Sequence, residues 1–424
     1  MKVCGIIVEY NPLHNGHLHH IKETKRISKC DVLVAVMSGN FVQRGEPAII
    51  DKFTRTKMAL ENYVDLVVEL PYAFCMQSAD TFAMGAISIL DKLEVDELYF
   101  GSESGNIVSL NKIADILDSD TYNSLLRTYL KEGNSYPTAS NLSMNHFLEN
   151  DDFSMPNNIL GIQYIKAIRE LKSNITPHTI PRINKGYYDE LDQNTMIQSA
   201  TAIRKEIING NQISKYVPDS VFNHLKGRKP CVLEDFTPYL QFTLKQTSKD
   251  ELQTISGMVE GLENKMIKSH DFDSIDQFIH MIISRRYTNA KLKRTIINVL
   301  CSVKNEDILE PTVDYIRILG MNEKGQLLLH SIKKEISVPI YTKISEGLHP
   351  LIDLELKTSK LYSLISDIDV FALEFKPLIF MRFKIQFLFF LFLGVALWSH
   401  STKAQSNFVL QIGNKKISSS LFEK

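Results

Sequence analysis

Short apolar segments alternate with amphipathic segments along the first half of this chain, and this alternation limits the possible folds more than any other feature. Segments with the composition of buried strands lie at residues 3–8, 32–37, 66–70, 97–100 and 178–183. Helical patterns lie at 16–28, 54–63, 78–93, 107–131, 158–171 and 199–208. Strands that are apolar on both faces need helices on both faces, so the sequence predicts an α/β fold with a Rossmann-like doubly wound parallel sheet. Ligands of such sheets bind beyond the carboxyl ends of the strands.

The strand pattern fades beyond residue 215, and a mainly helical pattern continues to about residue 335. We therefore predict a sheet-containing domain at 1–215, an α-rich domain at 216–375 and a separate segment at 376–424. Apolar residues make up 44% of the chain, which is ample for a buried core. The formal net charge of -1 gives the whole chain no attraction to nucleic acid, so any RNA contact requires a local basic surface.

The segment Asn11-Pro12-Leu13-His14-Asn15-Gly16-His17, here called the phosphate cradle, lies between the first strand and the first helix. Unpaired amides at a helix start favour an anion, and Gly16 allows a phosphate to approach the backbone closely. His14 and His17 are three residues apart, so both can face one side of the first turn. Nearby phosphate favours their protonated forms, which could stabilise charge on an α-phosphate and on leaving pyrophosphate.

Two alternatives apply to these histidines. His14, His17, His19 and His20 could be polar residues on an exposed helix start, because a short motif alone is weak. A zinc site is disfavoured, because no acidic or cysteine ligand is suitably spaced. The strand, loop and helix around the motif favour ATP binding.

A second set of polar residues lies at another strand-to-helix turn, in the stretch 198–204. Ser199 and Thr201 can cap the helix and donate to phosphate, and the planar guanidinium of Arg204 suits phosphate oxygens. The alternative is an ordinary helix cap followed by a surface arginine. Together with the phosphate cradle, these residues predict the opposite wall of a triphosphate site, with His14, His17, Ser199, Thr201 and Arg204 as catalytic residues.

These two motifs resemble those of the nucleotidyltransferase superfamily, which carries His-x-Gly-His and a late Ser-x-Thr-x-x-Arg turn. Over residues 1–375 the chain resembles one family in particular, the bacterial tRNA(Met) cytidine acetate ligases. The resemblance is carried by residues 8–17, by Pro156-Asn157-Asn158-Ile159-Leu160-Gly161, and most specifically by Met37-Ser38-Gly39-Asn40-Phe41-Val42-Gln43-Arg44-Gly45-Glu46-Pro47-Ala48.

The resemblance implies an enzyme that activates acetate with ATP as acetyl-adenylate, releasing pyrophosphate. The acetyl group then passes to N4 of the wobble cytidine of elongator tRNA(Met), and AMP leaves. Mg²⁺ is expected to assist, held mainly by phosphate oxygens and water. The partners are thus acetate and elongator tRNA(Met), and no stable protein partner is evident.

The resemblance also implies which residues bind ATP. Gly101, Arg182 and the pair Asn157 and Asn158 line the nucleotide, with Asn158 ranked above Asn157. The loop that holds ATP consists of Ile7, Val8, Glu9, Tyr10, Asn11, Pro12, Leu13, His14, Asn15, Gly16, His17, Leu18, His19 and His20.

Two further groups follow the second strand. Gln43 and Arg44 are candidates for the acetate or transfer side of the site. Lys52, Arg55 and Lys57 form a basic cluster, for which a solvated helix face is an equally good explanation.

The best candidate for an RNA-binding surface lies at residues 284–294. Basic side chains bind phosphate, and an aromatic side chain can stack on a base of the single-stranded anticodon loop. A plain solvated helix is the alternative. The candidates are Arg285, Arg286, Tyr287, Lys291, Lys293 and Arg294.

The C-terminal segment does not resemble the family. A basic start at 381–384 precedes an apolar run at 385–398, as in a secretory signal peptide, and this run is short for a membrane span. We hypothesise a gene fusion or frameshift; the alternative is a genuine tail that docks on the protein or on a membrane. The five dispersed cysteines and the lack of an N-terminal export signal predict a cytoplasmic protein.

Two other functions compete with the acetate ligase. A small-molecule adenylyl- or cytidylyltransferase would share both motifs, but it leaves the long helical region unexplained. An RNA-binding protein with a vestigial nucleotide fold would not need the intact pair of His14 and His17.

Overall fold

The computed structural model describes residues 1–148, 155–183, 195–259, 261–284, 287–308, 311–382, 409–412 and 415–418. One compact unit spans Met1–Met381, so residues 376–381 belong to it. In the second unit, Arg382–Lys424, strands β11 (Val409–Ile412) and β12 (Lys415–Ser418) pair antiparallel. The apolar run at 385–398 lies outside the described residues. No helix in the described ranges is long and apolar enough to cross a membrane.

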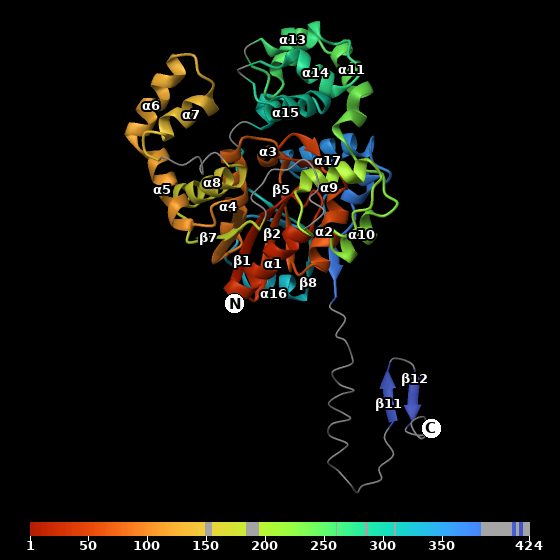
Figure 1. Cartoon of the computed structure of the whole chain (residues 1–424). Coiled ribbons are helices and arrows are strands. Elements are labelled where there is room, and N and C mark those ends of the chain that lie inside the picture. The colour runs from red at the N-terminus through yellow and green to blue at the C-terminus, as the bar shows by residue number, and fades with distance from the viewer. Residues whose placement is uncertain are drawn as a thin grey trace. The chain divides into compact units, whose positions relative to one another are not determined.

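The predicted doubly wound sheet is confirmed (Figure 1). Five parallel strands lie in the order β5-β2-β1-β6-β7, so the chain winds outward in both directions from β1. Their bounds are β1 Val3–Val8, β2 Val32–Ser38, β5 Leu66–Leu70, β6 Glu97–Ser102 and β7 Thr176–Pro181.

Helices cover both faces of this sheet, as the apolar strands require. In β2, the side chains of residues 32, 34 and 36 pack on one face, and those of 33, 35 and 37 pack on the other. The first face is covered by α4 (Ala79–Lys92), α5 (Ile107–Asp118) and α8 (Pro156–Glu170). The second face is covered by α1 (Asn15–Ser28), α2 (Lys52–Glu61), α9 (Ala200–Ile208) and α10 (Asp219–Leu225).

One predicted helix is in fact two. The pattern at 107–131 forms α5 and α6 (Asp120–Lys131), separated at Ser119. The Ser119 hydroxyl accepts a hydrogen bond from the Tyr122 amide and thus caps α6, and a side chain that caps a new helix favours a break at that residue.

The sheet continues past β5 with strands that the sequence analysis did not anticipate. Strand β8 (Ile316–Asn322) pairs antiparallel with β5, and β10 (Ile379–Met381) pairs parallel with β8. Arg317 interrupts the apolar pattern of β8, although its side chain is buried. The remaining elements of this unit include β9 (Ile340–Tyr341), α3 (Tyr72–Cys75), α16 (Glu323–Ser331), α17 (Pro350–Ser363) and α18 (Val370–Glu374).

Arg317 belongs to a buried network of two basic and three acidic side chains. Its guanidinium lies 2.8 Å from Glu69 and 2.6 Å from Glu374. The Lys52 ammonium lies 2.8 Å from Glu374 and also pairs with Glu69, while Glu355 lies 3.9 Å away. The network ties β5, β8, α2, α17 and α18 together.

Two of the three residues of the basic cluster predicted on α2 are therefore buried, and they do not form a solvated helix face. Lys52 and Arg55 are fully buried, and only Lys57 is exposed. The Arg55 guanidinium donates to the backbone carbonyl of Glu9 at 2.7 Å and to that of Ser38 at 3.0 Å. Arg55 thus joins the ends of β1 and β2 from inside the protein.

Glu355→Gln is expected to change how stability depends on pH. Burial, and next the charge of Glu69, raise the pKa of the Glu355 carboxyl from 4.5 to about 8. The folded wild type therefore keeps a proton that the unfolded chain loses, and its stability falls as the pH rises between those two values. Glutamine mimics the neutral acid. In urea unfolding, the free energy of unfolding of the variant minus that of the wild type should rise by at least about 1 kcal/mol from pH 5 to pH 8. The same difference at both pH values would contradict this prediction.

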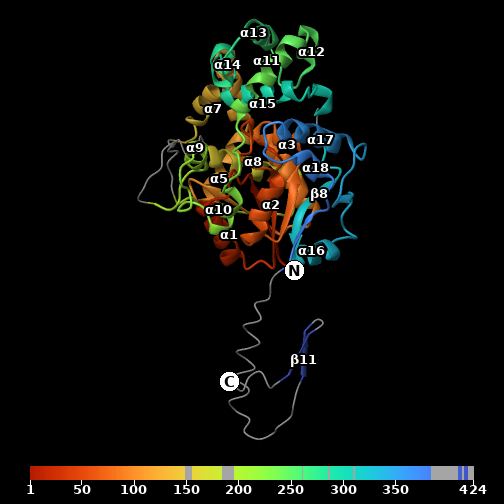
Figure 2. The same ribbon diagram turned by 90° about the vertical axis from the view of Figure 1, so that its right-hand side faces the viewer.

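A group of helices packs around a separate core of apolar side chains that includes Leu240, Phe278 and Leu292. These helices are α11 (Thr237–Gln246), α12 (Lys249–Thr254), α13 (Leu262–Lys268), α14 (Ile275–Ile282) and α15 (Asn289–Leu300). Figures 1 and 2 show that they lie beyond the carboxyl ends of the central strands, as do α6 and α7 (Tyr136–Met144). The exact bounds of a tRNA-binding domain at 216–375 stay a prediction.

Candidate active site

A cavity of about 260 Å³ opens at the carboxyl ends of β1 and β6. These two strands pair near their amino ends, at Cys4–Glu97 and Gly5–Leu98. Farther along, Ile7, Val8, Phe100 and Gly101 line the cavity. The site therefore lies where strand order reverses about β1, the place at which open α/β sheets bind ligands.

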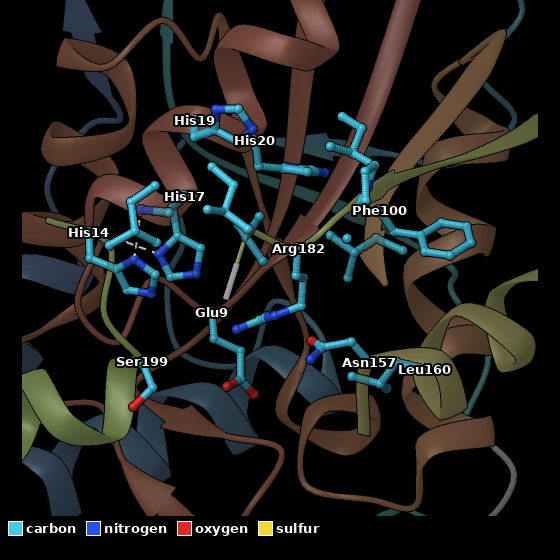
Figure 3. Close-up of a pocket in the computed structure, with 18 of the residues that line it drawn as sticks. Glu9, His14, His17, His19, His20, Phe100, Asn157, Leu160, Arg182 and Ser199 are labelled. Atoms are coloured by element: carbon cyan, nitrogen blue, oxygen red, sulfur yellow. Dashed lines mark hydrogen bonds between the residues drawn. The ribbon is translucent and has the colours of Figure 1, made fainter. Parts of the chain in front are cut away.

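The phosphate cradle forms the helix start that the sequence predicts. His14 caps α1: its Nδ1 accepts from the Gly16 amide at 3.0 Å, while His17 Nδ1 accepts from the His14 amide at 3.3 Å. Because each Nδ1 accepts a hydrogen bond, each neutral ring carries its own proton on Nε2. A Cβ on Gly16 would lie 2.8 Å from the His14 ring, so glycine is needed for this cap. The two imidazole centroids are 3.8 Å apart (Figure 3).

In the ligand-free site these histidines are neutral, which differs from the protonated state expected beside phosphate. Burial, and next the charge of Arg182, lower the pKa of His14 to about 3. Burial, and next the charge of His14, lower the pKa of His17 well below its usual value. Neutral rings still donate through Nε2, and an incoming phosphate would favour the protonated forms. No acidic side chain occupies the first turn of α1 to compete with an anion.

The loop residues expected to hold ATP divide into two groups. Those that line the cavity are Ile7, Val8, Glu9, His14, Gly16, His17, His19 and His20. The others shape the loop: Asn11 Oδ1 accepts from the Ile49 amide at 2.8 Å, and Asn15 Nδ2 donates to two carbonyls at 3.0 Å. Tyr10 and Leu13 are buried in the core, and Pro12 and Leu18 are also absent from the cavity wall.

The second motif lies against the cradle, but only part of it reaches the cavity. Ser199 lines the cavity, and its hydroxyl caps α9 by accepting from the Ala202 amide at 3.0 Å. Arg204 donates to the carbonyl of Asn11 at 2.9 Å and to the Thr201 hydroxyl at 3.3 Å. Arg204 and Thr201 therefore support the phosphate cradle without lining the cavity. Their catalytic role stays a prediction.

Gly101, Asn157 and Arg182 also line the cavity, and Figure 3 shows Asn157 on the side away from His14 and His17. The preference for Asn158 over Asn157 does not agree with this geometry. Asn158 is fully buried, and its Oδ1 accepts from the amides of Glu103 at 3.0 Å and Ser104 at 3.3 Å. Asn158 thus fixes the loop after β6, and Asn157 faces the ligand space.

Gly101→Ala is expected to raise the KM for ATP about tenfold, since a methyl group that crowds a ligand costs that much. A Cβ at this position meets only ordinary contacts, the nearest 3.7 Å away at Arg182. The free protein should therefore fold normally. Gly161→Ala is the contrast, because its Cβ would lie 2.3 Å from the Phe100 ring and should lower the melting temperature. An unchanged KM in Gly101→Ala would remove this residue from the nucleotide site.

Sequence reasoning missed the apolar wall of the cavity. Its aromatic members are Phe82, Phe100 and Tyr164, and the last two pack edge to face with centroids 5.6 Å apart. They come from three elements distant in sequence, α4, β6 and α8, so no local motif marks them. The other apolar lining residues are Leu160, Ile180, Pro181, Ile183 and Ile197.

The candidate RNA-binding residues are not a plain solvated helix face. Arg285 and Arg286 lie outside the described residues. Tyr287 is buried, its hydroxyl donates to the Val259 carbonyl at 2.9 Å, and the Lys291 ammonium lies over its ring. Lys293 pairs with Glu46, and Arg294 donates to the carbonyl of Gln43 at 3.0 Å.

The cavity suits magnesium carried by phosphate better than a metal held by the protein. Glu9 is the one acidic side chain among the described residues that line it. In the same described ranges, no three His, Cys, Asp or Glu side chains are grouped to hold a metal ion. Mg²⁺ on ATP needs few protein ligands, because phosphate oxygens and water supply most of its coordination.

Comparisons with known proteins identify the family. A family model described as HIGH Nucleotidyl Transferase matches residues 1–373. The tRNA(Met) cytidine acetate ligase of Bacillus subtilis (strain 168) is 40% identical over 383 residues, covering 86% of this chain and 92% of that protein. The enzyme of that name from Caldicellulosiruptor saccharolyticus is 43% identical over 378 residues, covering 86% and 94%.

Two solved structures of Thermotoga maritima TmcAL are also similar, each 33% identical and covering 90% of this chain and all of that one. The apo form gives a TM-score of 0.83. The form bound with alpha-thio ATP gives a TM-score of 0.80.

Proposed function

This chain belongs to the tRNA(Met) cytidine acetate ligase family, within the HIGH nucleotidyl transferases, and from that premise we propose that it activates acetate with ATP and acetylates a cytidine of tRNA(Met). The observation that carries this proposal is the placement of His14, Gly16 and His17 on the cavity wall, at the start of α1. The relative crystallised with alpha-thio ATP supports ATP as the nucleotide.

The proposed first step is adenylation of acetate. An acetate oxygen attacks the α-phosphorus, the bond from that phosphorus to the bridging oxygen breaks, and pyrophosphate leaves with the electron pair. The Nε2–H groups of His14 and His17, with the positive end of the α1 dipole, stabilise the charge on the phosphates. Mg²⁺ bound to the phosphates would neutralise part of that charge. No protein nucleophile is needed.

The proposed second step transfers the acetyl group to RNA. The N4 amine of the wobble cytidine attacks the carbonyl carbon of acetyl-adenylate, the carbon–oxygen bond to phosphate breaks, and AMP leaves. The proton lost from N4 goes to solvent or to phosphate. Gln43 and Arg44 line the cavity and are our candidates for the acetate end of the site.

We propose that Gly101, Asn157 and Arg182 hold the nucleoside part of ATP opposite the cradle. The helices α6, α7 and α11–α15 lie beyond the same end of the sheet as the cavity, so tRNA bound there could present its anticodon loop to acetyl-adenylate. Arg285, Arg286 and Lys291 remain the proposed basic contacts. We place the reaction in the cytoplasm, where tRNA and ATP meet.

Isotope transfer tests the proposed route. Acetate labelled with a heavy oxygen isotope is incubated with ATP, elongator tRNA(Met) and the protein, and AMP is analysed by mass spectrometry. The route through acetyl-adenylate leaves one acetate oxygen on each AMP. Acetylated tRNA with unlabelled AMP would reject the adenylate. No acetylation, with pyrophosphate release on a phosphorylated small molecule, would reject the acetate ligase itself.

A further inference from the structure

A short hairpin connects the cavity with helix α15. Its strands, β3 (Phe41–Val42) and β4 (Glu46–Pro47), pair antiparallel around the turn at 43–45. The hairpin lies within the stretch 37–48, which resembles the family most specifically, and the two proposed steps leave most of its residues without a role. Gln43 and Arg44 line the cavity from this turn.

One side of the hairpin is bonded to the phosphate site. The Gln43 amide donates to the Glu9 carboxylate at 2.9 Å, and Glu9 itself lines the cavity. The Glu46 carboxylate lies 3.9 Å from the Arg204 guanidinium, which binds the cradle through the carbonyl of Asn11. A shift of the turn would therefore disturb both the Gln43–Glu9 hydrogen bond and the contact between Glu46 and Arg204.

The other side of the hairpin is bonded to α15. The Arg294 guanidinium donates to the carbonyl of Gln43 at 3.0 Å, so Gln43 is held from both directions. The Lys293 ammonium pairs with Glu46, and both side chains are about one-quarter exposed. Gly45 has a φ of +80°, and a Cβ there would lie 2.4 Å from the backbone nitrogen of Arg294. The turn and the helix are in direct contact, and only glycine fits between them.

We propose that Lys293 and Arg294 are positioning residues for acetate adenylation. They hold residues 43–46 so that Gln43, Arg44 and Glu9 keep their places on the cavity wall. This inference rests on the proposed function, because adenylation is the step that it concerns. It also separates these two residues from the rest of the basic stretch at 284–294, whose proposed contacts are with RNA. A positioning role and an RNA-binding role affect different kinetic constants.

Arg294→Ala tests the proposal in the acetylation assay with elongator tRNA(Met). Misplacement of the cavity wall should lower kcat at saturating tRNA about tenfold or more, with the KM for tRNA within about threefold of the wild type. Acetate-dependent pyrophosphate exchange without tRNA should fall by the same factor. Arg294→Lys keeps a donor for the Gln43 carbonyl and should recover part of kcat. Lys333→Ala, an exposed position just after α16 and outside the helices proposed to bind tRNA, is the control and should behave as wild type.

Gly45→Ala provides an independent test, because it pushes the turn away from α15 and leaves every basic side chain in place. It should reproduce the kcat defect of Arg294→Ala. A raised KM for tRNA with normal kcat in Arg294→Ala would assign that residue to RNA binding and overturn the proposal. Normal kcat in Gly45→Ala would overturn it as well. A wild-type protein that acetylates no tRNA would instead reject the proposed function.

Discussion

His17→Ala is expected to slow acetate-dependent pyrophosphate exchange by about a hundredfold or more, because it removes a preorganised donor from the leaving phosphates. His17 lines the cavity, and its Nδ1 accepts from the His14 amide, which orients the ring. The loss of that one cap hydrogen bond costs only about 1 kcal/mol of stability, so the variant should remain folded. Exchange between labelled pyrophosphate and ATP measures the effect at the adenylation step alone.

His280→Ala is the matched control, because its side chain is 75% exposed on α14, outside the residues that line the cavity. It should keep full exchange activity. Exchange within threefold of the wild type in a well-folded His17→Ala protein would contradict the role that we give to this residue. A collapse of kcat together with a large fall in melting temperature would instead indicate that His17 maintains the loop.

Arg317→Met is expected to lower the free energy of unfolding by about 3–5 kcal/mol, as is usual when one partner of a buried ion cluster is removed. Arg317 lies between Glu69 and Glu374, and all three side chains are at least 95% buried. With the Glu355 carboxyl protonated, the variant leaves Lys52 as the sole cation beside the carboxylates of Glu69 and Glu374. Urea unfolding monitored by circular dichroism measures the change.

Arg169→Met removes an arginine from a partly exposed pair with Asp115 and should cost no more than about 1 kcal/mol. In the Arg317→Met background, Glu69→Gln should recover part of the lost stability because it removes an uncompensated charge. A loss in Arg317→Met no larger than that in Arg169→Met would show that the network contributes little to stability.

The central sheet could be predicted because its strands are apolar on both faces. Residues 32–37 pack into cores on both sides of β2, so their apolar composition predicts a buried parallel strand. Strand β8 was missed because Arg317 interrupts the apolar pattern of the strand. The partners of Arg317, Glu69 and Glu374, are far away in sequence. The burial of Lys52 and Arg55 could not be predicted for the same reason, because burial of a charge depends on partners that no local pattern reveals.

The site was predictable where one short segment builds it. The spacing of His14 and His17 predicted that both rings face one side of the first turn, but not that their Nδ1 atoms would accept hydrogen bonds from the amides of Gly16 and His14. The opposite wall collects Phe82, Phe100 and Tyr164 from separate elements, and only the fold brings them together. Likewise, the basic stretch at 284–294 indicated a charged surface, but the contacts of Lys293 and Arg294 with the hairpin depend on packing between distant segments.

The most direct test of the account is the fate of labelled acetate. The protein is incubated with ATP, labelled acetate and elongator tRNA(Met), and the RNA is digested to nucleosides and separated by chromatography. We expect ATP-dependent label in N4-acetylcytidine from the wobble position, and none when ATP is omitted. ATP turnover that leaves no label in the RNA would contradict it.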